Sequence, residues 1–212
     1  MAASHAGDAK PLSYLALGDS YTIGEGVAAS DRWPALLAAR LRQSGIDMSD
    51  PDVIAKTGWS VDELDAAITE HAPEPHDFVS LLAGVNDQYR GGAVDAYRTR
   101  FAALLDRAIT LAGGRADRVL VLAIPDWGVT PFGDASGRDV SVIASELDAF
   151  NDAARALCAQ RGVAFVDIAP DYRQHARDPA MLTHDGLHPS AAMHARWADA
   201  AFPVASRLLA HG

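Results

Sequence analysis

Cysteine is almost absent from this chain of 212 residues, which contains only one, Cys158. A single thiol cannot form an internal disulfide, so nothing in the sequence requires an oxidising compartment. The residues around Cys158 predict a helix, in which we expect a small buried side chain rather than a reactive thiol. Positive charge is also scarce, because 18 Lys and Arg residues face 28 Asp and Glu, giving a formal net charge of −10. This balance argues against binding to nucleic acids or anionic membrane surfaces, which attract basic patches.

Long apolar runs are missing as well, since no stretch approaches the ~20 apolar residues that a helix needs to span a bilayer. The first residues do not combine a basic start with an apolar segment, as a secretory signal peptide does, so we expect a cytoplasmic protein. Residues 1–11 are predicted to form a short disordered leader and residues 12–212 a single domain, because no linker or repeat divides the rest.

Short apolar segments alternate with helical patterns along the chain. The segments predicted to be buried strands are Leu12–Leu17, Val53–Lys56, Phe78–Leu82, Val119–Ile124 and Val163–Ile168. Helices are predicted at Trp33–Gln43, Val61–His71, Val94–Ala112, Val140–Arg161 and Ala191–Leu209, the last kinked or broken by Pro203. Because crossover helices join strands that run in the same direction, the alternation predicts an α/β fold with a parallel sheet covered on both faces.

Residues suited to catalysis or ligand binding follow several of these strands. Ser20, Gly58, Asn86 and the loop Pro125–Gly133 each come just after a predicted strand. Since ligands of such sheets bind beyond the carboxyl ends of the strands, we expect these four segments to meet at one crevice.

Two of the motifs supply the parts of a nucleophilic site. Ser20, in Gly18-Asp19-Ser20, is a candidate nucleophile, and a serine hydroxyl needs a base to take its proton during attack. Asp185-Gly186-Leu187-His188-Pro189 offers that base, because an imidazole titrates near neutral pH. Asp185 would hold the tautomer that leaves the other ring nitrogen of His188 free to accept the proton.

In this order, four segments resemble the conserved blocks of the GDSL family of serine esterases, also called SGNH hydrolases. They are Gly18-Asp19-Ser20, Thr57-Gly58-Trp59, Gly84-Val85-Asn86-Asp87 and Asp185-Gly186-Leu187-His188-Pro189, with Tyr21 where the family's name expects leucine. The resemblance implies a flavodoxin-like three-layer α/β/α sandwich with a central parallel sheet of about five strands.

The same resemblance implies a serine esterase that works through an acyl-enzyme and needs neither cofactor nor metal. The catalytic residues would be Ser20, His188 and Asp185. The oxyanion hole would comprise the backbone N–H groups of Ser20 and Gly58 and the side-chain amide of Asn86. We expect Asp87 to support the site by hydrogen bonding.

The loop from Ile124 to Gly133 is long for a strand–helix connection, and it has two interpretations. Its aromatic residues either form a wall of the substrate pocket or merely anchor the loop to the domain. The residues expected to supply apolar surface to a pocket are Tyr21, Trp59, Tyr89, Trp127 and Phe132. The polar side chains of Gln88 and Asp126 are further candidates for substrate contact.

Several alternatives stay open from the sequence. The absence of an apparent hydrophobic lid favours a small ester substrate with a short acyl group. Lysophospholipase or thioesterase activity on longer chains would use the same mechanism, and a non-catalytic ligand-binding module of this fold is an alternative of a different class. Gly24-Glu25-Gly26-Val27-Ala28-Ala29 fits a loose dinucleotide fingerprint but begins too far beyond the strand.

The remaining histidines offer little chemistry. His184, Asp185 and His188 lack the further ligand that a metal site needs. We expect the scattered histidines to be solvated, namely His71, His76, His175, His194 and His211.

Overall fold

A computed structural model describes residues 10–210, so most of the predicted leader lies outside the described range. Its centre is a five-stranded sheet of order β2-β1-β3-β4-β5 in which all neighbours are parallel. The strands are β1 (Tyr14–Gly18), β2 (Asp52–Ala55), β3 (Phe78–Leu82), β4 (Val119–Leu122) and β5 (Ala164–Val166). This is the strand order of flavodoxin-like sheets, so the predicted α/β class is confirmed.

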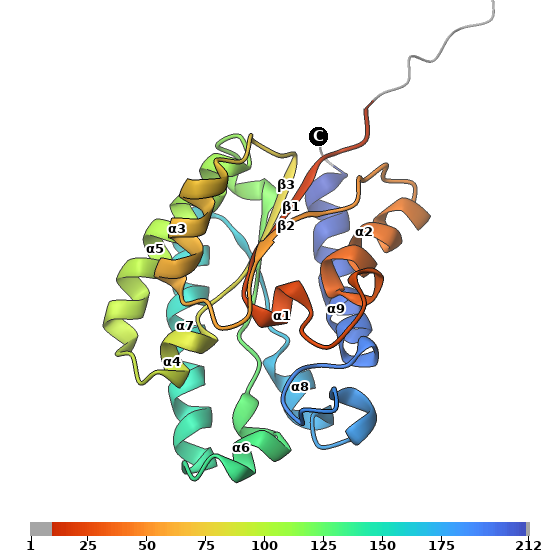
Figure 1. Ribbon diagram of the computed structural model, residues 1–212. Coiled ribbons are helices and arrows are strands. Elements are labelled where there is room, and N and C mark those ends of the chain that lie inside the picture. Colours follow the sequence, from red (N-terminus) through yellow and green to blue (C-terminus); the bar gives the residue numbers. More distant parts are fainter. Residues whose placement is uncertain (1–9, 211–212) are drawn as a thin grey trace, which may run out of the picture.

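Helices cover both faces of the sheet (Figure 1). On one face lie α3 (Val61–His71), α5 (Val94–Leu111) and α7 (Val140–Arg161), and on the other lie α2 (Trp33–Gln43) and α9 (Ala191–Leu209). The sandwich buries β1 and β3 along their whole length, which explains why their sequences are continuously apolar rather than alternating. Within residues 10–210, no helix is both long and apolar enough to cross a bilayer.

Local chemistry sets several helix ends. Ser60 and Glu63 form a capping box at the start of α3, and Gly162 ends α7 in the left-handed conformation. Cys158 is buried in α7, as expected, and burial raises the pKa of its thiol to about 12.

Of the kink or break expected at Pro203, the break is absent, because α9 runs continuously from Ala191 to Leu209. A proline in a helix removes one backbone hydrogen bond. Here Trp197, Ala201 and Ala205, on the buried side of α9, are all 0% exposed. Burial of this face holds the helix together across the missing bond.

Short helices that the sequence pattern did not predict gather at the carboxyl ends of the strands. They include α1 (Ser20–Ile23) after β1, α4 (Val85–Tyr89) after β3, η3 (Trp127–Val129) and α6 (Pro131–Ala135) after β4, and α8 (Ala169–His175) after β5. The other short turns are η1 (Ala29–Asp31), η2 (Ala116–Arg118) and η4 (Pro179–Met181). In Figure 1, α1, α4, α6 and α8 lie at the lower end of the sheet. This edge carries the candidate site.

Candidate active site

Ser20 is held by the short helix that follows β1. It is the first residue of α1, and Asp19 caps that helix by accepting a hydrogen bond from the Tyr21 N–H at 3.0 Å. Ser20 is only 5% exposed, and it borders a cavity of about 180 Å³. The strand-to-helix turn therefore fixes the candidate nucleophile at the edge of the sheet.

The sheet register brings the oxyanion candidates beside it. Gly18, the last residue of β1, pairs with both Ala55 of β2 and Leu82 of β3, so these three adjacent strands end at the same level. Gly58 and Asn86 follow those two neighbouring strands within a few residues, and both border the same cavity as Ser20. Parallel pairing thus explains why residues from three distant segments meet.

Gly58 has a backbone conformation that favours glycine. Its φ of +88° lies in the left-handed region, whereas a Cβ built there would meet no other atom within 4 Å. Arg90 donates a hydrogen bond to the Gly58 carbonyl at 2.7 Å. Arg90 therefore stabilises the turn through the carbonyl group of Gly58.

Asn86 lies on α4, and its amide is oriented by the neighbouring turn. Nδ2 donates to the backbone carbonyl of Trp59 at 2.8 Å, which uses one of the two N–H groups of that amide. Asp87 faces away from the chemistry, since it accepts hydrogen bonds from the Val61 N–H at 2.9 Å and from Arg100 at 3.1 Å. Burial raises the pKa of Asp87 despite these donors. It supports the turn, as expected.

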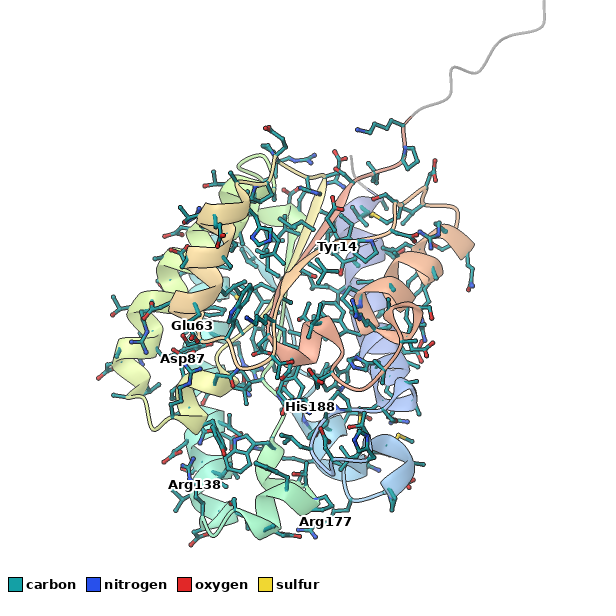
Figure 2. All side chains as sticks on the ribbon, viewed as in Figure 1. Tyr14, Glu63, Asp87, Arg138, Arg177 and His188 are labelled. Carbon is teal, nitrogen blue, oxygen red and sulfur yellow. The ribbon has the colours of Figure 1, made fainter. Side chains whose placement is uncertain are left out.

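His188 and Asp185 form a hydrogen-bonded pair in the loop before α9. Nδ1 of His188 lies 2.6 Å from Oδ2 of Asp185. The other carboxylate oxygen accepts hydrogen bonds from the backbone N–H groups of Leu187 and His188 and from the Thr183 hydroxyl. Partial burial opposes ionisation of Asp185, but the hydrogen bonds outweigh it and hold the pKa of this carboxyl well below its usual range. Figure 2 shows His188 close below α1.

One cavity gathers most of the residues that the sequence singled out. Its lining consists of Ser20, Tyr21, Thr57, Gly58, Val85, Asn86, Tyr89, Trp127, Phe132, Leu187 and His188. A larger hollow of about 430 Å³, beside Arg32 and Arg42, contains none of the predicted catalytic residues. The predicted catalytic residues Ser20 and His188 therefore border the smaller cavity.

The sequence agrees with a known family. A model of the GDSL-like lipase/acylhydrolase family matches residues 16–196. The chain belongs to this family. It is a carboxylic ester hydrolase of the GDSL, or SGNH, type. No curated protein matches the chain at a significant level.

Solved structures share the fold of this hydrolase. A crystal structure of TesA is 24% identical, with a TM-score of 0.69 over 92% of this chain and 99% of that one. The lipase/acylhydrolase from Enterococcus faecalis is 17% identical, with a TM-score of 0.71 over 92% and 96%. The psychrotrophic esterase EstA from Pseudoalteromonas sp. is also 17% identical, with a TM-score of 0.67 over 94% and 99%.

Some predicted residues of the hydrolase lie outside the cavity. Trp59 is not in the cavity lining, because its side chain packs against the hydrophobic core while its carbonyl orients Asn86. Gln88 and Asp126 are each 1% exposed and bind protein groups. Thr57, Val85 and Leu187 do line the cavity, and adjacency to Gly58, Asn86 and His188 is the signal that could have found them.

The prediction that His194 is solvated is wrong. Its side chain is 0% exposed, because α9 packs along α2 and encloses the ring. His76 is also largely covered, with 10% of its side chain exposed, and its ring contacts Asp52. His211 lies outside the described residues.

The glycine-rich segment of the hydrolase does not have the setting of a dinucleotide site. Gly24 ends α1 in the left-handed conformation, so the segment leaves a helix instead of joining a strand to one. Among the residues that the structure describes, no three His, Cys, Asp or Glu side chains come together as a metal site requires.

Proposed function

We propose that this hydrolase cleaves small esters with short acyl groups through an acyl-enzyme formed on Ser20. One observation carries the proposal: Ser20, Gly58, Asn86 and His188 border a single cavity, and Asp185 is hydrogen-bonded to the far nitrogen of His188. A nucleophile, a base, an orienting carboxylate and oxyanion donors are thus combined in one place.

The first step is attack of the Ser20 hydroxyl oxygen on the ester carbonyl carbon. Nε2 of His188 takes the hydroxyl proton, while Nδ1–H stays hydrogen-bonded to Asp185, whose low pKa keeps it an anion beside the new imidazolium. The bond to the alcohol then breaks, and His188 returns the proton to the leaving oxygen. Water repeats the sequence on the acyl-enzyme and releases the acid.

The negative charge of each tetrahedral intermediate needs fixed donors. We assign this role to the backbone N–H groups of Ser20 and Gly58 and to the Asn86 amide. One Asn86 N–H is held by the Trp59 carbonyl, which leaves the second for the oxyanion. Because these donors are oriented before the substrate arrives, they stabilise the transition state without reorganisation.

The size of the cavity favours short acyl groups. Pockets for drug-sized ligands measure roughly 300–1,000 Å³, whereas this one has about 180 Å³. Trp127 and Phe132 border it, and their rings lie 6.0 Å apart. A preference for long chains, as in a lysophospholipase or thioesterase, is the second candidate and would require these rings to move.

The test is hydrolysis of p-nitrophenyl esters from acetate to laurate by the wild type and Ser20→Ala. We expect short-chain activity that disappears in the variant, together with fluorophosphonate labelling of Ser20 in the folded wild type. Asn86→Ala should lower kcat by about a hundredfold or more. Ser30→Ala, at an exposed serine, is the control and should behave like the wild type.

Equal activity in Ser20→Ala would refute the assignment of the nucleophile. Folded wild-type protein that neither hydrolyses any ester nor reacts with the fluorophosphonate would instead favour a ligand-binding role. A maximum at long chains would retain Ser20 and reject the short-acyl preference.

A further inference from the structure

Trp127 occupies a special place in the cavity. It follows β4 in η3, is 1% exposed and borders the space next to Ser20. The rings of Tyr89 and Phe132 are both in edge-on contact with the indole, with centroids 5.2 and 6.0 Å away. The indole is therefore one wall of the cavity and is enclosed on its other sides.

The edge of the indole is fixed by a buried amide. Nε1 of Trp127 donates to Oε1 of Gln88 at 2.8 Å, and Nε2 of Gln88 donates to Oε2 of Glu146 at 2.6 Å. An indole nitrogen only donates and a carboxylate only accepts, so these two partners leave one orientation for the Gln88 amide. Gln88 is 1% exposed, and rotation would leave buried polar atoms unpaired.

The face of the indole is fixed by the same network. Arg138 donates to Oε2 of Glu146 at 2.7 Å, and its guanidinium carbon lies 5.5 Å from the centroid of the Trp127 ring, within cation–π range. The contacts thus run from Trp127 through Gln88, Glu146 and Arg138 and return to Trp127. We refer to Gln88, Glu146 and Arg138 as the indole clamp.

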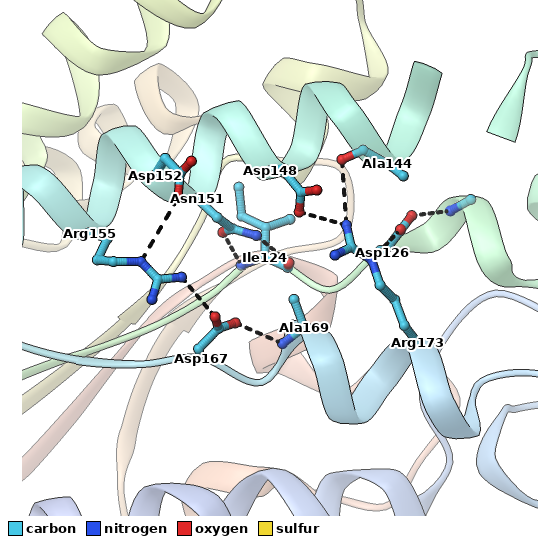
Figure 3. Close-up of polar contacts among 11 residues, drawn as sticks. Ile124, Asp126, Ala144, Asp148, Asn151, Asp152, Arg155, Asp167, Ala169 and Arg173 are labelled. Atoms are coloured by element: carbon cyan, nitrogen blue, oxygen red, sulfur yellow. Dashed lines mark hydrogen bonds and ion pairs between the residues drawn. The ribbon is translucent and has the colours of Figure 1, made fainter. Parts of the chain in front are cut away.

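The backbone that carries Trp127 is held separately. Asn151 of α7 binds both the N–H and the carbonyl of Ile124, at 2.8 and 2.9 Å. Asp126 accepts from the Gly128 N–H and from Arg173, which also reaches Asp148 (Figure 3). With its backbone fixed from α7 and α8, the remaining freedom of Trp127 is side-chain rotation, and the clamp opposes that.

We propose that the indole clamp makes Trp127 a rigid end wall that limits the length of the aliphatic chain of the ester lying against it. Gln88 and Glu146 are positioning residues in this proposal, since they act on substrate through Trp127. The proposal rests on the esterase function assigned to Ser20. The chain that meets the wall belongs either to the acyl group or to the alcohol, and the experiment separates the two.

The experiment measures kcat/KM over two ester series. The first varies the acyl group from acetyl to octanoyl on p-nitrophenol, and the second varies the alcohol of acetate esters from methyl to octyl. Trp127→Ala removes the wall, whereas Gln88→Leu and Glu146→Leu keep it and break the clamp. Glu146→Gln keeps an acceptor for the Gln88 amide and serves as the rescue variant.

A matched control removes a buried hydrogen bond elsewhere. Tyr14 and Ser80 share one at 2.9 Å in the core, and neither residue borders the cavity. Tyr14→Phe should therefore lower the melting temperature without changing chain-length preference. Melting curves of every variant distinguish a loss of fold from a change in selectivity.

We expect Trp127→Ala to raise the ratio of kcat/KM for the longest ester to kcat/KM for the shortest by about tenfold or more in one of the two series. The reason is that each added methylene that enters an apolar pocket is worth about that much. Gln88→Leu and Glu146→Leu should raise the same ratio several-fold. Glu146→Gln and Tyr14→Phe should keep the wild-type ratio.

Unchanged ratios in both series for Gln88→Leu and Glu146→Leu would overturn the proposal, provided that the activity still depends on Ser20. An equal fall for every chain length would also overturn it, since that result would mean that the variants disturb Asn86 on α4 instead of the wall. If Gln88→Leu does not fold, Glu146→Leu decides, because Glu146 has 42% of its side chain exposed. Activity that survives Ser20→Ala would refute the proposed function and not the clamp.

Discussion

Two histidines near the start of α9 lie in opposite environments. His188 lies in the preceding loop, borders the cavity and contacts a carboxylate at 2.6 Å through Nδ1. His194 lies inside α9, is 0% exposed, and its Nδ1 accepts the backbone N–H of Trp33 at 3.3 Å. Burial, with Arg32 nearby, lowers the pKa of His194 to about 3.

The difference shows what makes a histidine useful for catalysis. A carboxylate partner stabilises the protonated ring, whereas a backbone donor requires the unprotonated nitrogen. His194 instead serves the fold, because Trp33 begins α2 and Arg32 at its N-cap makes no side-chain capping bond. The ring of His194 accepts the first N–H of that helix.

Two aspartates that precede the proposed catalytic residues, Asp19 before Ser20 and Asp185 before His188, show the same contrast. Asp185 receives several hydrogen bonds, which hold its pKa low. Asp19 is 1% exposed, its Oδ2 has no hydrogen-bond partner, and burial raises its pKa to about 7. The site therefore has an ionised carboxylate beside His188 and a less readily ionised one, Asp19, behind Ser20.

The largest expected effect is on the catalytic side of this comparison. His188→Ala should reduce kcat by about a thousandfold or more, because no base remains to take the Ser20 proton. Its melting temperature should stay near that of the wild type, since the loop is partly exposed. Steady-state kinetics test the fall in kcat, and calorimetry on the same sample tests the melting temperature. Retained activity would contradict the assignment of His188 as the base.

The second largest expected effect is that of Asp19 on the pH dependence of stability. With a folded pKa of about 7 against an ordinary 3.8, Asp19 ionises in the unfolded chain first, so its contribution to stability falls as pH rises between these values. In Asp19→Asn this loss is absent. Between pH 4 and pH 8, the free energy of unfolding should therefore shift by roughly 4 kcal/mol in favour of the variant. Chemical denaturation of both proteins across this pH range tests the prediction. If the free energy of unfolding has the same pH dependence in both, the pKa of Asp19 is not raised in the folded state.

The smallest effect is on the structural histidine. His194→Phe keeps an aromatic ring but leaves the Trp33 N–H without an acceptor, which should lower the free energy of unfolding by about 1–3 kcal/mol. Well below its melting temperature the variant should retain wild-type kcat. His194→Gln, which can again accept that N–H, should recover part of the stability. A large fall in kcat of the folded variant would place His194 in the catalytic machinery.

Sequence patterns predicted the framework well where local chemistry decides the structure. The bounds of β3, α2, α3 and α7 agree with the prediction, because continuous apolar runs mark buried strands and caps mark helix ends. The motif residues Ser20, Gly58, Asn86 and His188 could be expected to meet, since parallel strands bring their carboxyl ends to one edge.

Contacts between distant segments could not be predicted in this way. Nothing in the local sequence of Gln88 indicates that it bridges Trp127 and Glu146, because that pairing depends on how α7 packs across η3. The burial of His194 likewise depends on the α2–α9 contact and not on its neighbours in sequence. Trp59 was expected to line the pocket, but its side chain packs against the hydrophobic core instead.

The order of the site along the chain has a consequence for biosynthesis. Ser20 follows the first strand, whereas His188 immediately precedes the last helix, which packs along α2. A ribosome therefore releases the proposed nucleophile well before the proposed base. Activity that depends on both residues requires the chain from Ser20 to His188 to fold together, so its recovery during refolding would report folding of all the segments between them.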